Sequence, residues 1–321
     1  MRNGSAVVVA YNSAGALRSC LASILKNSEW QAVVVDNASS DNPGRVIAEF
    51  SDVRFLRNDT NLGFAAAANQ GAKVSSGEVI LLLNPDVVAE PDAVGRLAAT
   101  VAEEGIGAAG GALLDSSGQS QRGFQFRRFP TLAAMLAEVL LLNRAWPGNP
   151  WNRRYRCLDL DDSRPQHVDQ PAGACLAVRR EAWESIGGFD ESFYPVWFED
   201  VDFCRRLADR GWKIAYCPDA RFPHAGGHSV SRLPFRDKQA FWYANMLRYF
   251  SKHHGRLKTT ILRAGILAGL ALRSLASLMG AGPRDVPVKE VLGGYAHAAR
   301  IVVQSSASRA PSKHSVGVAA V

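Results

Sequence analysis

Short apolar runs and amphipathic segments alternate along the first third of the chain. The runs are rich in Val, Leu and Ala without a polar break, which is typical of strands buried on both faces of a sheet. The expected strands are Ala6–Tyr11, Ala32–Val35, Val53–Leu56, Val79–Leu83 and Gly107–Leu114. The expected helices are Leu17–Leu25, Phe64–Val74 and Pro91–Glu103. This alternation predicts an α/β fold with a mostly parallel central sheet flanked by helices.

The pattern is less regular after residue 115. Ala133–Leu142 is strongly apolar and predicts either a core helix or an apolar flap that meets a lipid-linked acceptor or a membrane surface. A loop of small residues then leads into a short strand that ends at Val178, and a helix is expected at Arg179–Ile186 and a strand at Lys213–Cys217. Helical spacing returns beyond Phe241, so the C-terminal part of the chain is expected to be helical.

Charge is distributed unevenly along the 321 residues, whose formal net charge is +7. From Arg236 to the end, 13 Lys and Arg stand against 3 Asp and Glu, so this part carries +10 and the remainder −3. A basic segment on a mildly acidic body favours an anionic partner. The apolar stripe of Ile261–Leu278 suits an anionic membrane surface, or else this helix packs on the rest of the chain. A nucleic-acid partner is not expected, because no motif interleaves aromatic and basic residues there.

The cysteines and the apolar runs bear on localisation. The five cysteines form no CxxC pair and are odd in number, so we expect reduced core residues rather than a disulfide framework or a zinc site. The first residues lack a signal-peptide pattern. Arg263 and Arg273 interrupt the longest apolar stretch, Ile261–Gly280, so we predict no transmembrane helix. We expect the protein in the cytoplasm, at the inner face of the cell membrane.

Three polar residues, Asn12, Asp36 and Asp86, come just past the ends of expected strands. Ligands of parallel sheets bind beyond these ends, so the three side chains are expected to line one crevice, although each alone is more often a turn or cap residue. No GxGxxG follows the first strand and no GxxxxGK[ST] occurs, which removes the main support for dinucleotide and P-loop sites. Asp36 can accept hydrogen bonds from a nucleoside, and Asp86 can bind a divalent cation that carries a diphosphate.

A second acidic group lies in Phe193–Cys204, which reads FYPVWFEDVDFC. Acids among so many apolar residues must be hydrogen-bonded, ligand-bound or functionally tuned, because an unpaired buried charge is costly. A helix expected to end at Gly211 places Glu199, Asp200 and Asp202 in its first turn, where capping is the simpler interpretation. On this helix Asp200 points away from the face that the other two acids share. A single carboxylate in a cleft meets the requirement for a general base.

His224 and His228 follow in PHAGGHS and are either structural residues or metal or phosphate contacts, with His224 preferred.

Taken together, these segments resemble the inverting family 2 glycosyltransferases of the GT-A fold, and within them the bacterial rhamnosyltransferase-like branch. The motifs are VVVAYN, VVVDNASSDN, NLGFAAAANQG, ILLLNPD and the long segment that begins AGACLAVRR and ends FPHAGGHS. They occur in this order over roughly Ala6–Arg248. NPD alone is a weak signal, but the whole series is specific.

The resemblance implies roles for individual residues. Asp200 would be the catalytic base, with Glu199 beside it in the Glu-Asp pair. Asp86 would take the last position of the family's Asp-x-Asp metal motif, and His224 would complete a site for Mg²⁺ or Mn²⁺ or for the diphosphate. The nucleotide-sugar donor would lie against Tyr11, Asn12, Asp36, Asn61, Gly63, Phe64, Asn84, Gly173 and Ala174, with Asn69 behind the loop. Trp197 and Asp202 would face the acceptor.

One position departs from the family pattern, because the metal motif begins with Asn84 rather than Asp. An amide is a weaker ligand than a carboxylate, so the metal would be held mainly by Asp86 and the diphosphate. The implied domains are a GT-A catalytic domain at 1–235, a basic helical extension at 236–304 and a disordered tail at 305–321. Within the catalytic domain, 1–115 would bind the nucleotide and 116–235 the acceptor.

The implied reaction transfers a sugar, rhamnose from dTDP-rhamnose, to a saccharide or a polyprenyl-linked saccharide in cell-surface polysaccharide synthesis. UDP- and GDP-sugars stay open as donors. Asp200 would take the proton of the acceptor hydroxyl as its oxygen attacks the anomeric carbon, which inverts that centre. One alternative is a sugar-1-phosphate nucleotidyltransferase, which needs a basic Gly-rich loop where this chain has Tyr11–Gly15. The other is a non-catalytic nucleotide- or glycan-binding protein, against which the intact Glu199-Asp200 pair and Asp86 argue.

Overall fold

The computed structural model describes residues 4–26, 29–226 and 233–305 of the chain. Contacts divide the chain into two units, Met1–Phe129 with Arg153–Arg232 and Pro130–Asn152 with Leu233–Val321. The segment 130–152 is thus grouped with the C-terminal helices, whereas the predicted boundary at residue 235 includes it in the first domain. The roles assigned to the parts of the chain stay predictions. His228 and the expected tail beyond residue 305 lie outside the described residues.

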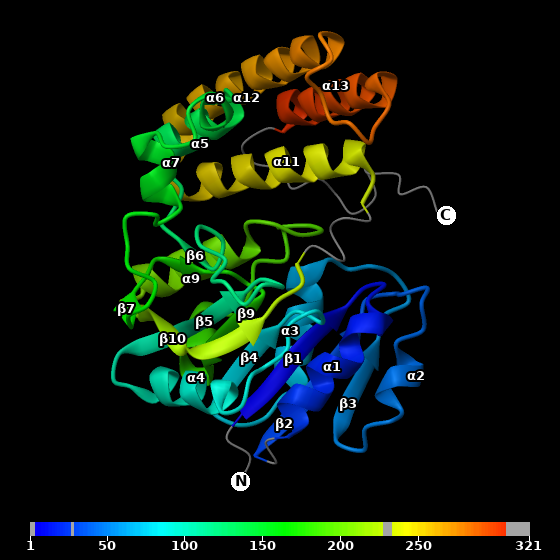
Figure 1. Cartoon of the computed structure of the whole chain (residues 1–321), viewed down its shortest axis with the longest axis vertical. Helices are drawn as coiled ribbons and strands as arrows, with labels where there is room; N and C mark the ends of the chain where they lie inside the picture. The colour runs from blue at the N-terminus through cyan, green and yellow to red at the C-terminus, as the bar shows by residue number, and fades with distance from the viewer. Residues whose placement is uncertain (1–3, 27–28, 227–232, 306–321) are drawn as a thin grey trace. The chain divides into compact units, whose positions relative to one another are not determined.

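The first unit is built on an eight-stranded sheet with the order β3-β2-β1-β4-β9-β5-β10-β7 (Figure 1). Its strands are β1 Gly4–Ala10, β2 Trp30–Asp36, β3 Val53–Arg57, β4 Val79–Leu83, β5 Ile106–Leu114, β7 Gln166–His167, β9 Cys175–Arg179 and β10 Lys213–Pro223. Strands β1 to β4 pair in parallel, as do β5 and β10, while β9 runs antiparallel between β4 and β5. The predicted mostly parallel sheet is confirmed. Two short strands, β6 (Phe126–Arg127) and β8 (Gln170–Pro171), form a separate ladder.

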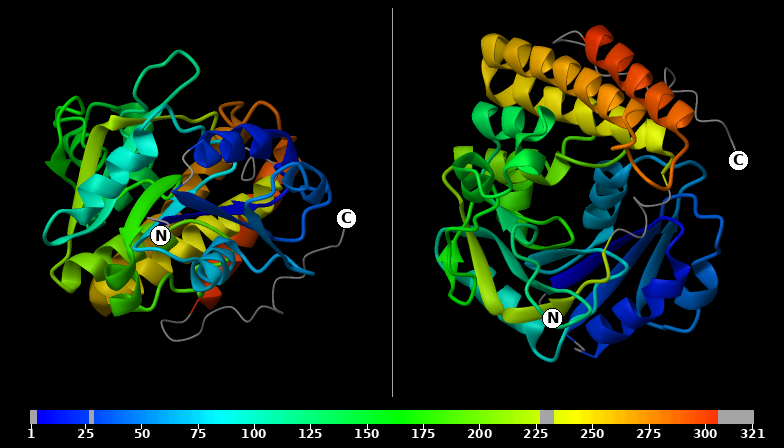
Figure 2. Two further views of the ribbon diagram at one scale, coloured as in Figure 1. Left: turned by 90° about the horizontal axis from the view of Figure 1, so that it is seen from below. Right: turned by 45° about the horizontal axis from the view of Figure 1, so that its top comes forward.

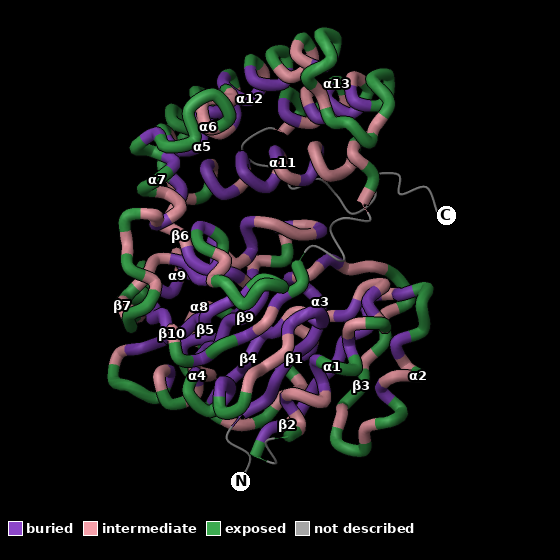
Figure 3. Tube along the Cα trace, viewed as in Figure 1, coloured by how far each residue is buried: buried purple, intermediate pink, exposed green. Residues whose placement is uncertain are grey.

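Helices cover both faces of this sheet. They are α1 Ala14–Leu25, α2 Gly44–Ile47, α3 Phe64–Val74, α4 Ala93–Ala102, α8 Arg180–Ile186 and α9 Glu199–Asp209. Successive side chains of a strand point to opposite faces, so Ala6, Val8 and Ala10 pack with α1 and α4, whereas Val7 packs with α3 and α9. Figure 3 shows the central strands as buried, while β3 at the edge is largely exposed or half-buried. Burial on both faces explains why the strands lack polar breaks.

The second unit consists of helices in the described residues. They are α5 Leu132–Val139, α6 Leu142–Ala145, α7 Pro150–Tyr155, which runs across the unit boundary, α11 Phe235–His253, α12 Gly255–Leu278 and α13 Val288–Gln304. The three long helices pack on one another (Figure 2). The apolar segment predicted as one helix ends at Val139, and Leu141 has a positive φ of 65°. Its buried side packs on α12, where Gly265 lies against Leu136 and Arg273 donates to the carbonyl oxygens of Val139 and Glu138. This packing matches the core-helix interpretation.

Helix α12 has the length and mean hydropathy of a membrane span, and a third of its most apolar window is buried. The prediction of no transmembrane helix depends on the charges of Arg263 and Arg273. Arg263 donates to the carbonyl oxygens of Val302 and Ser305 in or just after α13. Core helices of soluble proteins meet the same two criteria, so the match alone does not make α12 a membrane span.

Candidate functional site

Asp200 is held in one orientation by three hydrogen bonds. It lies in the first turn of α9, where its Oδ2 accepts from the amide of Gly173 and from Nε2 of Gln170, each at 3.0 Å. Its Oδ1 accepts from the amide of Val201 at 2.8 Å. A Cβ at Gly173 would lie 3.2 Å from the Cβ of Asp200, so only glycine permits this close approach without a shift. The side chain of Asp200 is therefore fixed while the residue stays partly exposed.

Opposing effects set the proton affinity of Asp200. Burial raises its pKa above the ordinary value, while the amides of Gly173 and Val201 and the charge of Arg127 act to lower it. The net result is a raised pKa. A carboxylate that binds a proton more readily than usual, yet is oriented by donors, has the properties of a general base.

Glu199, the neighbour of Asp200, has a different environment. It is 5% exposed, and its Oε2 has no hydrogen-bond partner among the described residues. Burial and the negative charge of Asp200 raise the pKa of Glu199 well above its usual value. We infer that Glu199 holds a proton under conditions in which Asp200 is ionised, so the two acids of the Glu-Asp pair differ in charge.

Replacing Glu199 with Gln is expected to change how stability depends on pH. A carboxyl group whose pKa is raised on folding makes its full contribution to the free energy of unfolding below its unfolded-state pKa of about 4.3. This contribution is lost as the pH rises through the folded-state pKa. Gln does not titrate, so its contribution does not change with pH. The melting temperature of Glu199→Gln should therefore rise relative to that of the wild type as the pH increases from about 4 to about 8. Thermal unfolding of both proteins across this range measures the difference. A difference that is constant with pH would contradict the protonated state of Glu199.

The third acid of the cluster, Asp202, is used inside the fold. Its carboxylate is fully buried and pairs with Nε of Arg206 at 2.7 Å. Arg206 also donates to the carbonyl oxygens of Ile186 and Gly188. This agrees with the expectation that Asp200 points away from Asp202, and it leads us to omit Asp202 from the proposed acceptor site. Trp197, just before α9, has a positive φ of 78° and is partly exposed, so it stays a candidate for acceptor contact.

Asp86 and His224 are brought together by two strand ends. Val87, after β4, pairs with His224, after β10, in an isolated bridge, and the amide of Ala225 donates to the carbonyl oxygen of Asp86. The Oδ2 of Asp86 lies 3.8 Å from Nε2 of His224, and both side chains are nearly buried. The side-chain Nε2 of Gln121 donates to the carbonyl oxygen of His224, and Oε1 of the same side chain lies 3.0 Å from Nδ1 of His224. A proton on Nδ1 leaves the Nε2 lone pair facing Asp86.

This geometry fits a divalent cation held by a carboxylate oxygen and an imidazole nitrogen. Two ligands 3.8 Å apart can each reach one ion at about 2.1 Å. The described residues contain no group of three or more His, Cys, Asp or Glu that could hold a metal. Mg²⁺ in enzymes commonly takes one or two protein ligands together with substrate phosphates. Asp86 and His224 therefore fit a site that a diphosphate and water complete.

A chain of backbone contacts connects the Asp86 loop to Asp200. The amide of Asn84 donates to the carbonyl oxygen of Ala174 at 2.9 Å, and its carbonyl oxygen accepts from the amide of Val87. Gly173, next to Ala174, donates to Asp200. Asn84, Gly173 and Ala174 thus join the candidate metal site to the candidate base.

The loops after β1 and β2 leave the sheet at the same edge as the Asp86 loop, because β1 pairs in parallel with both β2 and β4. Their strand ends are in register, with Ala10 opposite Asp36. Asp36 is 1% exposed, and its Oδ1 accepts from the amide of Ser39. Asn12 has a positive φ of 50°, and its Oδ1 accepts from Ser40, so its side chain supports the Asp36 loop. The partly exposed Tyr11 precedes it.

The loop before α3 is tied to the segment that leads into the acidic cluster. Oδ1 of Asn61 accepts from the amide of Gly63, and the amide of Phe64 donates to the carbonyl oxygen of Pro195 at 2.7 Å. Gly63 has a φ of 85°, and a Cβ there would lie 2.9 Å from the ring of Tyr194, so glycine is required. Asn69 exchanges hydrogen bonds with the backbone of Phe189.

Sequence reasoning missed several residues that this site uses. Asn37 donates to Oδ1 of Asn61 and accepts from the amide of Leu62, and it directly follows Asp36. Gln170 orients Asp200 and Gln121 orients His224. Gln170 stands in the stretch that contains Gly173 and could have been singled out, whereas nothing in the sequence distinguishes Gln121.

The fold and this site define a class, the GT-A glycosyltransferases. The mannosyltransferase PcManGT from Pyrobaculum calidifontis, in complex with GDP-Man and Mn²⁺, matches with a TM-score of 0.54 and 15% identity over 94% of this chain and 86% of that one. TarS 1-349 from S. aureus, in complex with UDP, matches with a TM-score of 0.53 and 16% identity over 92% and 81%. At these identities the likeness establishes the fold and no more.

The chain belongs to glycosyl transferase family 2, whose model matches residues 5–187, and a model for glycosyl transferase family group 2 matches residues 159–286. The N-acetylglucosaminyl-diphospho-decaprenol L-rhamnosyltransferase of Mycobacterium tuberculosis is 32% identical over 84% of this chain and 90% of its own length. The low-salt glycan biosynthesis hexosyltransferase Agl10 of Haloferax volcanii is 24% identical over 84% of each. The chain is a glycosyltransferase of the rhamnosyltransferase-like branch, which confirms the resemblance inferred from the motifs.

Proposed function

We propose that this protein is an inverting glycosyltransferase that moves rhamnose from dTDP-rhamnose to a saccharide carried on a polyprenyl diphosphate. The observation that carries the reaction type is Asp200, a partly exposed residue whose carboxylate is oriented by hydrogen bonds and has a raised pKa. The donor sugar and the lipid-linked acceptor are supported by the mycobacterial relative, whose name specifies an L-rhamnosyltransferase acting on N-acetylglucosaminyl-diphospho-decaprenol.

In the proposed mechanism Asp200 takes the proton of the acceptor hydroxyl while the hydroxyl oxygen attacks the anomeric carbon. Gly173 and Gln170 keep Oδ2 in place, so the attack is directed at one face of the sugar. Asp86 and His224 would hold the divalent cation, which offsets the charge that develops on the departing diphosphate. The backbone hydrogen bond from Asn84 to Ala174 connects the candidate metal site to the loop that orients Asp200.

The proposal is tested by incubating the purified chain with dTDP-, UDP- and GDP-sugars and a short-chain N-acetylglucosaminyl diphospholipid. Release of the nucleoside diphosphate together with a rhamnose-containing lipid, from dTDP-rhamnose alone, is the expected result. Preferred transfer of another sugar would show that the proposed donor is wrong while the proposed reaction type stands. Nucleotide binding without transfer to any saccharide would contradict the proposed function.

We further propose that α12 rests on an anionic membrane surface, where a lipid-linked acceptor is found. Apolar side chains along one stripe of α12 are exposed, among them Leu257, Ile261, Leu272 and Leu275. The strongly basic charge of residues 236–321 complements anionic lipid.

The membrane contact is tested by sedimentation with vesicles. The wild type is expected to bind phosphatidylglycerol vesicles and not phosphatidylcholine vesicles, and Leu272→Ser combined with Leu275→Ser should reduce binding at least tenfold, since each change removes about 2 kcal/mol of apolar burial. Val303→Ser on α13 is the control, because Val303 is at least as exposed as the two leucines but belongs to another helix. Equal binding by the double variant, or none by the wild type, would contradict the contact.

A further inference from the structure

Arg127 is connected through one neighbour each to the candidate base and to the candidate metal ligand. It belongs to β6, where it pairs directly with Gln170 of β8, the residue that donates to Asp200. Its positive charge acts to lower the pKa of Asp200, against the larger raising effect of burial. On the other side it contacts Phe124, whose ring stacks on His224 with centroids 5.6 Å apart and an interplanar angle of 12°. One residue, Gln170, thus separates Arg127 from the candidate base, and one residue, Phe124, separates it from the candidate metal ligand.

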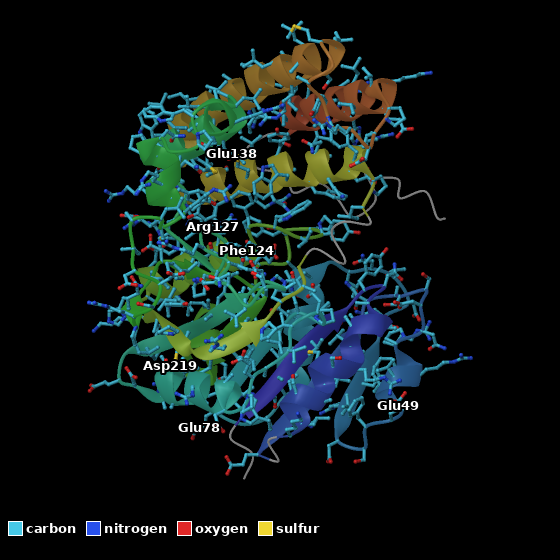
Figure 4. The ribbon with its side chains drawn as sticks, viewed as in Figure 1. Glu49, Glu78, Phe124, Arg127, Glu138 and Asp219 are labelled. Carbon is cyan, nitrogen blue, oxygen red and sulfur yellow. The ribbon has the colours of Figure 1, made fainter. Side chains whose placement is uncertain are left out.

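The guanidinium of Arg127 is positioned by neutral groups. Its Nε donates to the carbonyl oxygen of Gly123 at 3.0 Å. Its Cζ lies 5.9 Å from the ring centroid of Phe124 and 5.6 Å from that of Tyr155. Figure 4 shows Phe124 and Arg127 close together. These contacts hold the planar group in place and leave its terminal nitrogens, Nη1 and Nη2, without a hydrogen bond to any described residue.

Neighbouring arginines have carboxylate partners, whereas Arg127 has none within the part of the chain that the structure describes. Arg128 pairs with Asp159 at 2.7 Å, and Arg122 lies 3.4 Å from Asp162. Arg127 is half-buried and acts on Asp200 through space, with no ion pair between these two described residues, so an anionic ligand would supply the direct partner that a half-buried cation favours. The planar fork of a guanidinium matches two phosphate oxygens at once.

We propose that Arg127 binds a phosphate group of a substrate diphosphate. This inference rests on the proposed function, which brings two diphosphates to the site, that of the nucleotide donor and that of the lipid-linked acceptor. Arg127 would neutralise one of them, because Gln170 connects it to Asp200 and Phe124 connects it to His224. No sequence feature separates Arg127 from Arg128, because the two are adjacent and identical in type.

The test compares the wild type with Arg127→Gln, with Arg127→Lys and with the control Arg122→Gln. Two acceptors carry the same sugar on a short alkyl chain, one with and one without the diphosphate. Loss of a charge-assisted contact should weaken the binding of the affected substrate by about 10- to 100-fold. Arg127→Lys keeps the charge without the fork and should recover part of the loss, and it replaces Arg127→Gln if that variant does not fold.

Each source of the phosphate gives a distinct result. Weaker dTDP binding, measured by thermal shift, identifies the donor diphosphate. Unchanged dTDP binding with a raised KM for the diphosphate acceptor alone identifies the acceptor diphosphate. Unchanged affinity for both, including the case in which only kcat falls, overturns the proposal. Wild-type protein that transfers no sugar overturns the proposed function instead, so the two failures are distinguishable.

Discussion

Replacing Asp200 with Asn is expected to reduce sugar transfer by about 10²–10⁴-fold, the usual contribution of a general base, while the protein stays folded. The amide oxygen of Asn can still accept from Gly173 and Gln170, so the loop is retained. The variant lacks the basic oxygen that takes the acceptor proton. Steady-state kinetics should show the loss in kcat with dTDP binding unchanged.

The pH profile of the wild type gives a second readout of the same group. Since burial raises the pKa of Asp200, the acid limb of kcat/KM should lie above the ordinary carboxylate value of about 3.9. Asp209→Asn is a matched control, because Asp209 ends the same helix in an exposed pair with Arg205. Normal turnover by a folded Asp200→Asn protein would rule out Asp200 as the base.

Replacing Asp86 with Ala is expected to abolish the part of nucleotide binding that depends on a divalent cation. Ligand at 100 times its dissociation constant stabilises a folded protein by about 2.7 kcal/mol, which a thermal-shift assay detects. The wild type should show a larger shift with dTDP plus Mg²⁺ or Mn²⁺ than with dTDP alone. Asp86→Ala should show the same small shift in both conditions, because His224 alone provides one ligand.

The control for this experiment is Asp92→Asn, which changes an exposed carboxylate in the turn before α4. Asn tolerates the positive φ of 62° at this position, so the variant should keep the full metal-linked shift. A metal-linked shift that survives in Asp86→Ala would place the cation elsewhere.

The sheet could be predicted because its signal is local. Strands such as Val79–Leu83 are buried on both faces, so the run of apolar residues in the sequence is itself the strand. The direction of β9 could not be predicted, because a strand buried on both faces has the same composition whether it runs parallel or antiparallel. The break after Val139 was missed for a related reason, since Leu140 and Leu141 continue the apolar pattern while the backbone leaves the helix.

The candidate site could be predicted only where the residue type itself indicates a chemical role. Asp86, Asp200 and His224 are titratable groups beside strand or helix ends, and the structure brings Asp86 and His224 together. Residues that position them through hydrogen bonds, such as Gln121 and Gln170, depend on contacts across more than 25 residues of sequence, which no local pattern reveals. Asp202 shows the reverse case, because an acid in the same motif serves an internal ion pair.

The central claim, a single displacement assisted by Asp200, is tested most directly by the anomeric configuration of the product. The purified chain is incubated with dTDP-rhamnose and a N-acetylglucosaminyl diphospholipid, and the new glycosidic linkage is determined by nuclear magnetic resonance. A single displacement gives a product whose configuration is opposite to that of the donor. A product with the donor's configuration would contradict the single displacement and the role of Asp200 in it.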